Sequence, residues 1–589
     1  MNKKYTTLLL LLSLLVQTNY IFAKDIPTTT LHKIDILNIG SIAYPQALEE
    51  RSDIPFKILV DEEFRKLMSD SIDYEKFRPT LIFFEKGFVA PQFPGKKISF
   101  GYISVTALSG TYRFPKEMSD IQKAKIESNI KQDVDTNLVG TQFLVKKWNP
   151  FEFKNINGLV AIQYSYEQTL RGKDQTNIIT TNLYDSDVQL QIVLSAPKKE
   201  YKKWLAYYNQ MIRTFNRKVN IADIATFEYP TEIQDRKDIP FRHLVDNEFK
   251  KILGDSVNYE QFRPGLLFLD RDFAIADTTN VPAFGSLSFN VLPEYKKRTL
   301  SKDSIKVDVL ESNIKLNVQQ NIDSTDYRIN KWGEFKVVEL GGVPAIQYSY
   351  EQQLREEQTS EVHSTYIFDK PAQIQISMSS PINTLPDWKN RYDKILESYQ
   401  RLVNIPNVGT MYYPLHLEER SDIPFEVLVD KESKKKLGDS IDYERFRPTL
   451  LFLKDDFNQN DSTQLKSFSS ITINVQEGDF SKLSYPDSIS LSTIEFEIKA
   501  SVERNLKNTG YSLTGWDSFN SCVVKGSRII SYSYTQQLSG TEPKHMCITY
   551  FYTPTKQMQV TLTSSESEYS FWKTEYDRMV DSFRLSGWR

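Results

Sequence analysis

Apolar residues recur four positions apart in three separate stretches of the chain, and mostly polar residues fill the positions between them. The three stripes are Ile126, Ile130, Val134 and Leu138, then Leu310, Ile314, Val318 and Ile322, then Ile494, Ile498, Val502 and Leu506. A single narrow apolar stripe on a polar background is typical of an amphipathic helix that packs on a sheet. The pattern therefore predicts one long surface helix in each stretch.

A second stripe, begun by a tryptophan, predicts a closing helix in each stretch. Its members are Trp204, Tyr208, Met211 and Phe215, then Trp388, Tyr392, Ile395 and Tyr399, then Trp572, Tyr576, Met579 and Phe583. Between the two helices apolar and polar residues alternate, as they do in strands that have one packed face. In the second stretch this alternation predicts a four-strand meander, with a hairpin turn at Gly341-Gly342. Its strands cover 335–339, 343–352, 364–368 and 373–379.

Shorter elements precede each long helix. In the first stretch the sequence predicts strands at 39–44, 81–84 and 98–108, and a short helix that begins at Asp61. Aspartate is a good N-cap and glycine a common stop, so the counterparts of this helix run from Asp246 to Gly254 and from Asp430 to Gly438. Each stretch is therefore expected to be α+β, with an antiparallel sheet and three helices.

Short motifs recur at one nearly constant spacing. Asp-Ile-Pro-Phe occurs at 53–56, 238–241 and 422–425, and Trp148, Trp332 and Trp516 lie 184 residues apart. A period of this length belongs to a whole domain, because solenoid units repeat every 20 to 50 residues or so. The sequence thus predicts three tandem copies of one module, at 34–218, 219–402 and 403–589. The linkers are short and poor in Gly and Ser, which favours a semi-rigid array.

The order of elements in each copy resembles the PsbP/Mog1-like fold. The residues that carry the resemblance are Gly342-Val343-Pro344-Ala345 before Tyr348-Ser349-Tyr350, the strand 374–378, and the final Trp388, Tyr392, Ile395 and Ser398-Tyr399. The resemblance implies an α/β/α sandwich in every copy. Most members of that fold are non-enzymatic binding or assembly factors, so it also implies a binding role, and it brings no catalytic motif.

The N-terminus has the composition of a secretory signal peptide over residues 1–23. Lys3 and Lys4 precede an apolar run from Leu8 to Val16, and Ala23 stands at the expected cleavage point. We therefore expect an exported protein, periplasmic or extracellular, that is soluble after cleavage and does not span a membrane. The formal net charge of −3 over 589 residues disfavours nucleic acid as a partner, since that needs a clustered basic surface.

Histidine and cysteine give no catalytic or metal-binding pattern. None of the five histidines recurs in all three copies, and no two have the spacing of metal ligands, so we expect no metal, no cofactor and no repeated His-dependent mechanism. The two cysteines, Cys522 and Cys547, occur only in the third copy. We place them on the first and third strands of its meander, beyond disulfide reach, and expect two buried thiols.

Carboxylates do recur. Asp53, Asp61, Asp70, Asp73 and Glu75 return as Asp238, Asp246, Asp255, Asn258 and Glu260, and as Asp422, Asp430, Asp439, Asp442 and Glu444. Paired acids hydrolyse glycosidic bonds when they lie a few ångströms apart. Structural roles are favoured here, because Asp61 is a helix cap, Asp70 closes a turn, and Asp53 is expected to pair with Arg78.

The last strand of each meander carries the most suggestive polar pattern. Its polar side holds the candidate partner-binding residues Gln189 and Gln191, Gln373 and Gln375, and Gln557 and Gln559. A second strand alternates likewise, with Tyr164 and Tyr166 on one side and Gln163, Ser165 and Glu167 on the other. Such alternation indicates a sheet with one packed and one polar face. The polar face is either a hydrated amide network or a surface for a partner. The tyrosines are expected on the apolar side, in the core.

These observations favour an exported, non-catalytic binding or scaffold protein of the cell envelope or secreted space. Three repeated modules would give it avidity for a protein or glycan partner. Two alternatives stay open. One is a carboxylate-dependent hydrolase, which would use Asp70, Asp73 and Glu75 with raised pKa values. The other is a carrier of a small apolar ligand, held between sheet and long helix.

Overall fold

The computed structural model describes most of the chain. The described residues are 30–36, 39–52, 54–61, 64–65, 74–90, 100–110, 118–170, 174–185, 187–221, 224–254, 256–275, 283–293, 307–323, 325–354, 359–369, 372–405, 408–429, 434, 441–461, 468–480, 491–524 and 527–585. The predicted signal peptide lies outside them, as do Asp53, Asp70, Asp73, Asp255, Asp430 and Asp439. The chain forms two compact units, Met1–Ile72 with Pro79–Asn216 and Asp73–Arg78 with Arg217–Arg589.

One large antiparallel sheet dominates the first unit. Its strand order is β3-β4-β5-β10-β9-β8-β6, and β7 also pairs with β8. The strands are β3 (Leu48–Glu50), β4 (Leu81–Glu85), β5 (Tyr102–Ser109), β6 (Phe143–Trp148), β7 (Glu152–Ile156), β8 (Leu159–Leu170), β9 (Asp174–Tyr184) and β10 (Val188–Pro197). Strand β10 is therefore central, with β5 on one edge and β9 on the other.

The second unit contains two more large sheets with the same strand order. The second sheet runs β13-β14-β15-β20-β19-β18-β16 with β17 on β18, and the third runs β23-β24-β25-β29-β28-β27-β26. The strands of the second are β13 (Ile233–Asp235), β14 (Leu266–Asp270), β15 (Ser286–Pro293), β16 (Tyr327–Trp332), β17 (Lys336–Leu340), β18 (Val343–Leu354), β19 (Thr359–Phe368) and β20 (Ala372–Pro381). Those of the third are β23 (Leu417–Glu419), β24 (Leu450–Lys454), β25 (Ser470–Glu477), β26 (Tyr511–Val524), β27 (Ser527–Leu538), β28 (Lys544–Tyr552) and β29 (Lys556–Ser565).

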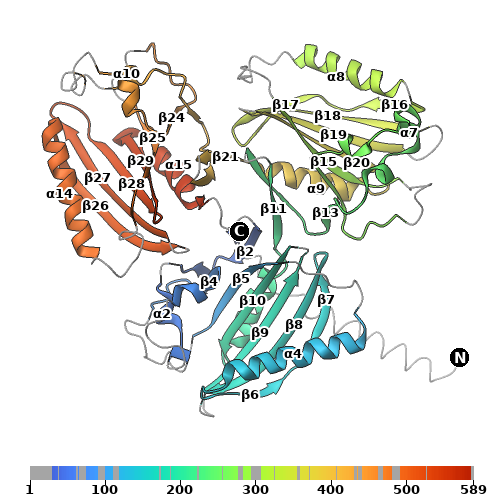
Figure 1. Ribbon diagram of the computed structural model, residues 1–589, viewed down its shortest axis with the longest axis horizontal. Coiled ribbons are helices and arrows are strands. Elements are labelled where there is room, and N and C mark those ends of the chain that lie inside the picture. The colour runs from blue at the N-terminus through green and yellow to red at the C-terminus, as the bar shows by residue number, and fades with distance from the viewer. Residues whose placement is uncertain are drawn as a thin grey trace. The chain divides into compact units, whose positions relative to one another are not determined.

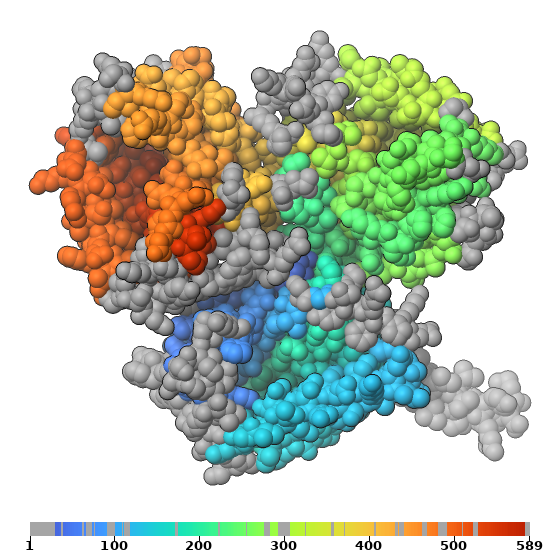
Figure 2. Space-filling model, viewed as in Figure 1, coloured from blue at the N-terminus to red at the C-terminus, as the bar shows by residue number. Residues whose placement is uncertain are grey.

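Two helices cover opposite faces of each large sheet. The long helices are α4 (Asp120–Leu138), α8 (Val307–Ile322) and α14 (Leu491–Thr509), and the closing helices are α5 (Tyr201–Met211), α9 (Leu385–Glu397) and α15 (Tyr569–Asp581). Figure 1 shows α8 on one side of the second sheet and α9 on the other. The outward faces of α4 and α8 form part of the surface in Figure 2. Antiparallel sheets layered with helices confirm the predicted α+β class.

Each closing helix packs on the apolar side of its central strand. In the first unit Trp204, Tyr208 and Met211 of α5 share one core with Leu190 and Ile192 of β10. The second and third sheets repeat this arrangement with α9 on β20 and α15 on β29. The tryptophan stripe of the sequence is therefore the core-facing side of each closing helix, as its periodicity predicts.

Local signals explain where the helices begin and end. Helix α4 starts at a capping box, in which the Ser119 side chain accepts from the Gln122 backbone N–H and the Gln122 side chain accepts from the Ser119 N–H. The predicted helix after Asp246 is confirmed as α7 (Asn247–Leu253), and it ends at Gly254, whose φ is 82°. Short helices that we did not predict are α2 (Phe56–Leu59), η1 (Tyr74–Phe77), α6 (Phe241–Leu244), η2 (Tyr259–Phe262), α10 (Phe425–Leu428), η4 (Tyr443–Phe446) and η5 (Glu566–Glu568).

Smaller sheets use the strands at the ends of each stretch. The first unit has the hairpin of β1 (Leu31–Ile36) and β2 (Gly40–Pro45). The second unit has β11-β12-β21-β22-β30, made of β11 (Asn216–Ile221), β12 (Ala225–Tyr229), β21 (Gln400–Ile405), β22 (Gly409–Tyr412) and β30 (Arg584–Leu585). Residues Gln400 and Arg401 of β21 pair with β12, and residues 402–405 pair with β22. Strand β21 thus joins β12, which precedes the second large sheet in the chain, to β22, which precedes the third, within one small sheet.

A buried ion pair accompanies β21. Arg401 Nη2 lies 2.9 Å from Asp369 Oδ1, and the two side chains are 5% and 2% exposed. Tyr399 donates to Asp369 Oδ2 at 2.7 Å, and the Arg401 guanidinium lies 3.7 Å from the centre of the Tyr413 ring. Burial raises the pKa of Asp369, while Arg401 acts in the opposite direction. The pair is thus withdrawn from solvent and contacts the Tyr399 hydroxyl and the Tyr413 ring.

Candidate functional site: an amide strip on each large sheet

The six candidate glutamines lie on the central strands β10, β20 and β29, at matching positions of the three large sheets. One glutamine of each pair forms a row with the two residues directly opposite it on neighbouring strands. The three rows are Thr106–Gln191–Asn182, Asn290–Gln375–Tyr366 and Asn474–Gln559–Tyr550. Directly opposed residues of an antiparallel pair point to the same face. Each row is therefore a line of polar side chains across three strands.

The other glutamine of each pair forms a second row two residues along the strand. These rows are Leu108–Gln189–Tyr184, Leu292–Gln373–Phe368 and Gln476–Gln557–Tyr552. We call the two rows of a sheet together its amide strip. In the first two sheets the outer glutamine is flanked by a leucine on one side and an aromatic ring on the other. The strip thus combines amides with apolar surface.

The amide strips lie on the face that the long helices cover, a position the sequence interpretation got wrong. We expected Tyr164 on the opposite side from the glutamines, and Gln163 with them. The pairing through β9 shows the reverse. Gln191 opposes Asn182 on β9, and Asn182 opposes Ile162 on β8, so Ile162 and, two residues on, Tyr164 lie on the face of Gln191. Gln163 opposes Thr181 and lies on the other face. Strands β10 and β8 are separated by β9, so alternation within each strand did not fix their relative phase.

The tyrosines beside the strips are packed, as expected, but against the long helix. In the third sheet Tyr532 and Tyr534 form one cluster with Val502 and Leu506 of α14. Burial raises the pKa of Tyr534 to about 12, so its hydroxyl stays protonated. Their role is the core between helix and sheet, rather than a stacking platform.

A lysine of each long helix lies near the tryptophan of the edge strand. The Nζ-to-ring distances are 5.8 Å for Lys131 and Trp148, 5.6 Å for Lys315 and Trp332, and 5.8 Å for Lys499 and Trp516. These cation–π contacts hold the helix over the half of the face that carries the tyrosines. The glutamines of the amide strips occupy the neighbouring part of the same face, and in the third sheet the strip residue Tyr552 also packs with Ile494 of α14.

The glutamines are partly exposed, and their hydrogen-bonding capacity is only partly used. Gln189 donates to Asn182 at 3.2 Å, Gln375 to Ser377 at 3.3 Å and Gln559 to Thr561 at 2.9 Å. Among the described residues, the side chain of Gln191 has no hydrogen-bond partner. A carboxamide has two donor hydrogens and a carbonyl oxygen that accepts. Each strip therefore presents amide groups with unused donors and acceptors.

The strip residues on β5, β15 and β25 were missed from the sequence. Asn290 and Asn474 stand 184 residues apart, and Thr106 stands at the corresponding position of the first sheet. Their spacing matched the repeat, but nothing local marked them, since their place beside the glutamines depends on strand pairing across more than 80 residues.

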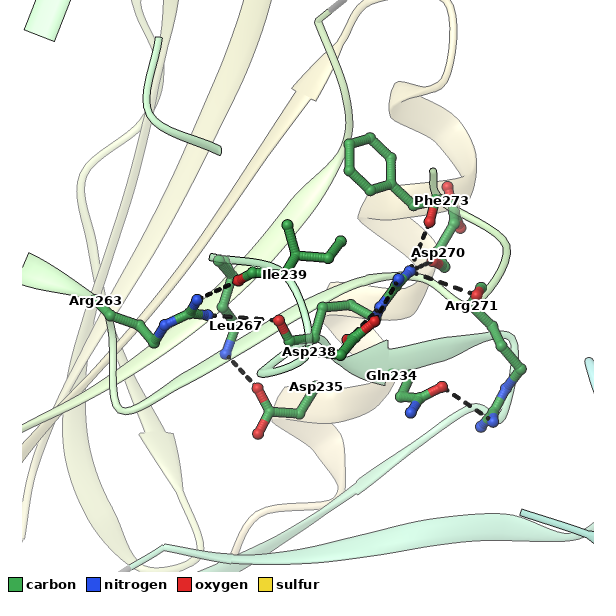
Figure 3. A network of polar contacts seen from close by, with 10 residues as sticks. Gln234, Asp235, Asp238, Ile239, Arg263, Leu267, Asp270, Arg271 and Phe273 are labelled. Carbon is green, nitrogen blue, oxygen red and sulfur yellow. Dashed lines mark hydrogen bonds and ion pairs between the residues drawn. The ribbon is translucent and has the colours of Figure 1, made fainter. Parts of the chain in front are cut away.

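The recurring carboxylates form a different network from the one expected. We expected the arginine of Phe-Arg-Pro to pair with the aspartate of Asp-Ile-Pro-Phe. In the second unit Asp238 instead pairs with Arg236, through contacts of 2.8 and 2.9 Å, and Arg263 pairs with Glu260 at 2.7 Å. Figure 3 shows Arg263 donating to the carbonyl of Ile239 in the same loop. Glu260 is three residues from Arg263 in one tight turn, so the two side chains meet without help from the rest of the fold.

The same network recurs at the equivalent positions. Arg420 pairs with Asp422 and Arg447 with Glu444 in the third sheet, and Arg78 pairs with Glu75 in the first stretch. The hydrogen bond from Arg263 is the largest influence on Glu260 and lowers the pKa of its carboxyl, and Arg447 acts likewise on Glu444. These carboxylates stay ionised and fix loop backbone, as when Glu260 accepts from the Phe241 N–H at 2.6 Å.

The two cysteines of the third sheet lie on different strands, and Cys547 Sγ lies 3.4 Å from the Tyr569 hydroxyl. Cys522 lies on β26 and Cys547 on β28, and β27 pairs with both strands and separates them. Across β27, Cys522 is in line with Ile529 and Phe551, and Cys547 lies four residues from Phe551 along β28. The predicted placement on the first and third strands is confirmed. Cys547 is a free, buried thiol, and burial raises its pKa, which disfavours the reactive thiolate. Over the described residues, no three His, Cys, Asp or Glu side chains gather as metal ligands.

None of the described helices combines the length and the apolar content that crossing a bilayer requires.

Comparisons with known proteins reach only the level of the fold. No protein-family model matches the chain, and no curated protein matches it. Among solved structures it is similar to cyanobacterial PsbP (CyanoP) from Synechocystis sp. PCC 6803, with 12% identity and a TM-score of 0.21 over 31% of this chain and 95% of that one. It is also similar to a protein of unknown function from Pseudomonas aeruginosa, with 16% identity and a TM-score of 0.15 over 22% and 78% of the two chains. Scores this low carry no argument about activity.

Proposed function

We propose that the protein is an exported, non-catalytic binding or scaffold protein built from three tandem PsbP/Mog1-like modules, and that the amide strip of each module contacts the partner. The observation that carries the proposal is the recurrence of one polar row, centred on Gln191, Gln375 and Gln559, at the same register in all three large sheets. If these residues only had to be polar and face water, any polar residue would suffice at the centre of the row, and glutamine would not need to recur there.

Three equivalent strips favour multivalent binding. A partner with repeating features would engage a second strip at a high effective concentration once the first is bound. The continuous pairing of β21 with both β12 and β22 supports this between the second and third modules, because it limits the ordering that binding would otherwise require.

The two alternatives receive less support. A hydrolytic acid must hold its proton near neutral pH, whereas the pKa values of Glu260 and Glu444 are lowered. An apolar carrier needs room between helix and sheet, whereas Val502, Leu506, Tyr532 and Tyr534 pack directly on one another there.

The test uses the intact mature chain and a graded set of variants. Gln375→Ala, the double variant with Gln559→Ala and the triple variant with Gln191→Ala would be immobilised beside the parent chain. Each would be exposed to envelope and culture-fluid fractions of the source. The matched control is Gln261→Ala with Gln320→Ala, since both glutamines are exposed and lie outside the strips.

Avidity predicts that retention of the partner falls more steeply than the number of strips lost, while circular dichroism stays unchanged. Equal retention by the parent and the triple variant would refute the strips as the contact surface. Loss of retention by the control pair as well would point to a general surface effect instead.

A further inference from the structure

We propose that the amide strips bind a neutral carbohydrate. The proposal rests on the proposed function and names the ligand class of the same site. The first observation is charge. The strip residues are glutamine, asparagine, threonine, leucine, tyrosine and phenylalanine, and not one of them is ionised at neutral pH. Phosphates, nucleic acids and acidic sugars are held by arginine and lysine, and a strip without them lacks the means to bind such ligands.

The second observation concerns hydrogen bonds. Within the described residues, the partly exposed side chains of Gln191, Asn290 and Asn474 make no hydrogen bond. Every carboxamide offers both a donor and an acceptor, and so does every hydroxyl group. A ligand rich in hydroxyl groups therefore satisfies these amides in either orientation. An apolar ligand would bury these amides without hydrogen-bond partners, which is unfavourable.

The third observation is the apolar border of the strip. Leu108 and Leu292 are 43% and 39% exposed, and they lie directly opposite Gln189 and Gln373. On the other side of these glutamines lie the rings of Tyr184 and Phe368. A pyranose ring has polar edges and an apolar C–H face, so it matches a row of amides that is edged by leucine and an aromatic ring.

The sheet topology argues against an extended polypeptide as the ligand. Peptides that bind to sheets commonly add a strand to an exposed edge, where backbone groups are free. The strips lie on β10, β20 and β29, and each of these strands is already paired along both edges. The strips therefore offer side chains only, which suits a ligand that binds through hydroxyl groups.

The experiment uses the intact mature chain on a printed array that holds neutral and acidic oligosaccharides. Hits would be followed by calorimetry at low and high salt. We expect neutral glycans to be bound with an affinity that salt leaves unchanged, since no ion pair forms. The triple variant of Gln191→Ala, Gln375→Ala and Gln559→Ala should bind about tenfold more weakly, because each strip loses the central amide that bonds to the ligand.

The control pair Gln261→Ala with Gln320→Ala should bind like the parent chain. Binding that is confined to acidic glycans, or that salt abolishes, would overturn the proposal, and so would an array without any bound glycan. If the strips nonetheless retain a protease-sensitive partner in the fraction assay, the binding function stands and only the carbohydrate inference fails. If the triple variant keeps full affinity for a neutral glycan, the strips are not the site and both proposals fail.

Discussion

The phenolic oxygen of Tyr392 lies 2.6 Å from Oγ1 of Thr365, and both side chains are buried. The bond ties the closing helix α9 to strand β19 through the apolar core. Tyr208 with Thr181 and Tyr576 with Thr549 repeat it at 2.6 and 2.8 Å. The sheet face opposite the amide strip is therefore fixed to its helix at one equivalent point in all three sheets.

Replacing Tyr392 by phenylalanine should destabilise the chain. The change leaves the Thr365 hydroxyl buried without its partner, which lowers the free energy of unfolding by about 1–3 kcal/mol. Urea unfolding followed by tryptophan fluorescence measures the loss. Adding Thr365→Val should restore part of it, because both polar groups are then gone. Tyr207→Phe is the control, and a loss of equal size there would contradict the assignment.

Gly285→Ala should be poorly tolerated. A Cβ atom at this position would lie 1.9 Å from Nε1 and 2.2 Å from Cε2 of Trp388, so the buried indole ring would have to move. Overpacking of this kind destabilises by about 1–3 kcal/mol. The matched control is Gly265→Ala, where the nearest atom would be the Phe289 carbonyl oxygen at 3.3 Å. Thermal unfolding of both variants tests this prediction. Similar unfolding midpoints for the two variants would contradict the close packing of Trp388 against Gly285.

The Arg401–Asp369 pair should be costly to break from one side only. Arg401→Met leaves a buried carboxylate without its cation, and we expect a loss of about 3–5 kcal/mol. The double variant Arg401→Met with Asp369→Leu should recover much of this loss, because the buried Asp369 carboxylate is gone together with its cation. A double-mutant cycle in urea gives the coupling energy. Additive losses from the two single changes would show that the side chains do not act as a pair.

Acid should weaken the loop network of the second and third sheets. The pKa of Glu260 is lowered from its ordinary value of 4.5, chiefly by its hydrogen bond with Arg263, and Glu444 behaves alike with Arg447. A carboxyl whose pKa is lower in the folded state stabilises that state above its unfolded value, and the effect disappears as the pH falls through 4.5 towards the folded value.

Glu260→Gln with Glu444→Gln should therefore make the unfolding midpoint less dependent on pH in this range. The change should lower the midpoint at neutral pH. Thermal unfolding measured from neutral pH down to below 4.5 tests both statements. A pH profile that the double variant leaves unchanged would mean that other groups govern the acid response.

The sequence was sufficient for elements whose signals are local. Three of these signals depend only on residues close to them in the sequence, and the structure has the expected element at each. They are the apolar stripe that ends at Leu138, the tryptophan stripe that begins at Trp388, and the turn at Gly341-Gly342. The cap at Asp246 and the stop at Gly254 also needed no information from elsewhere. The α+β fold class and the positions of most helices and strands could be predicted from these local signals.

The sequence did not show which residues of strands far apart in the chain share a face of the sheet. Alternation shows that Gln189 and Gln191 share a face, and that Tyr164 and Tyr166 share one, but it does not relate the two sets. Whether the two sets lie on the same face depends on how β9, which lies between their strands, pairs with each of them. The partner of Arg263 posed the same difficulty, since Asp238 and Glu260 were both compatible in charge and only the turn of η2 selects Glu260.

The course of β21 also decides how the chain is best divided. Its first two residues pair with β12 and the rest with β22, so a cut after Leu402 would leave each fragment with part of a strand. Backbone groups that lose their partners in this way form bare edges, which pair readily with other chains. Fragments cut there will tend to aggregate instead of reporting on the isolated parts. For protein engineering the second unit is therefore best kept whole, and substitution is the way to inactivate either of its two large sheets.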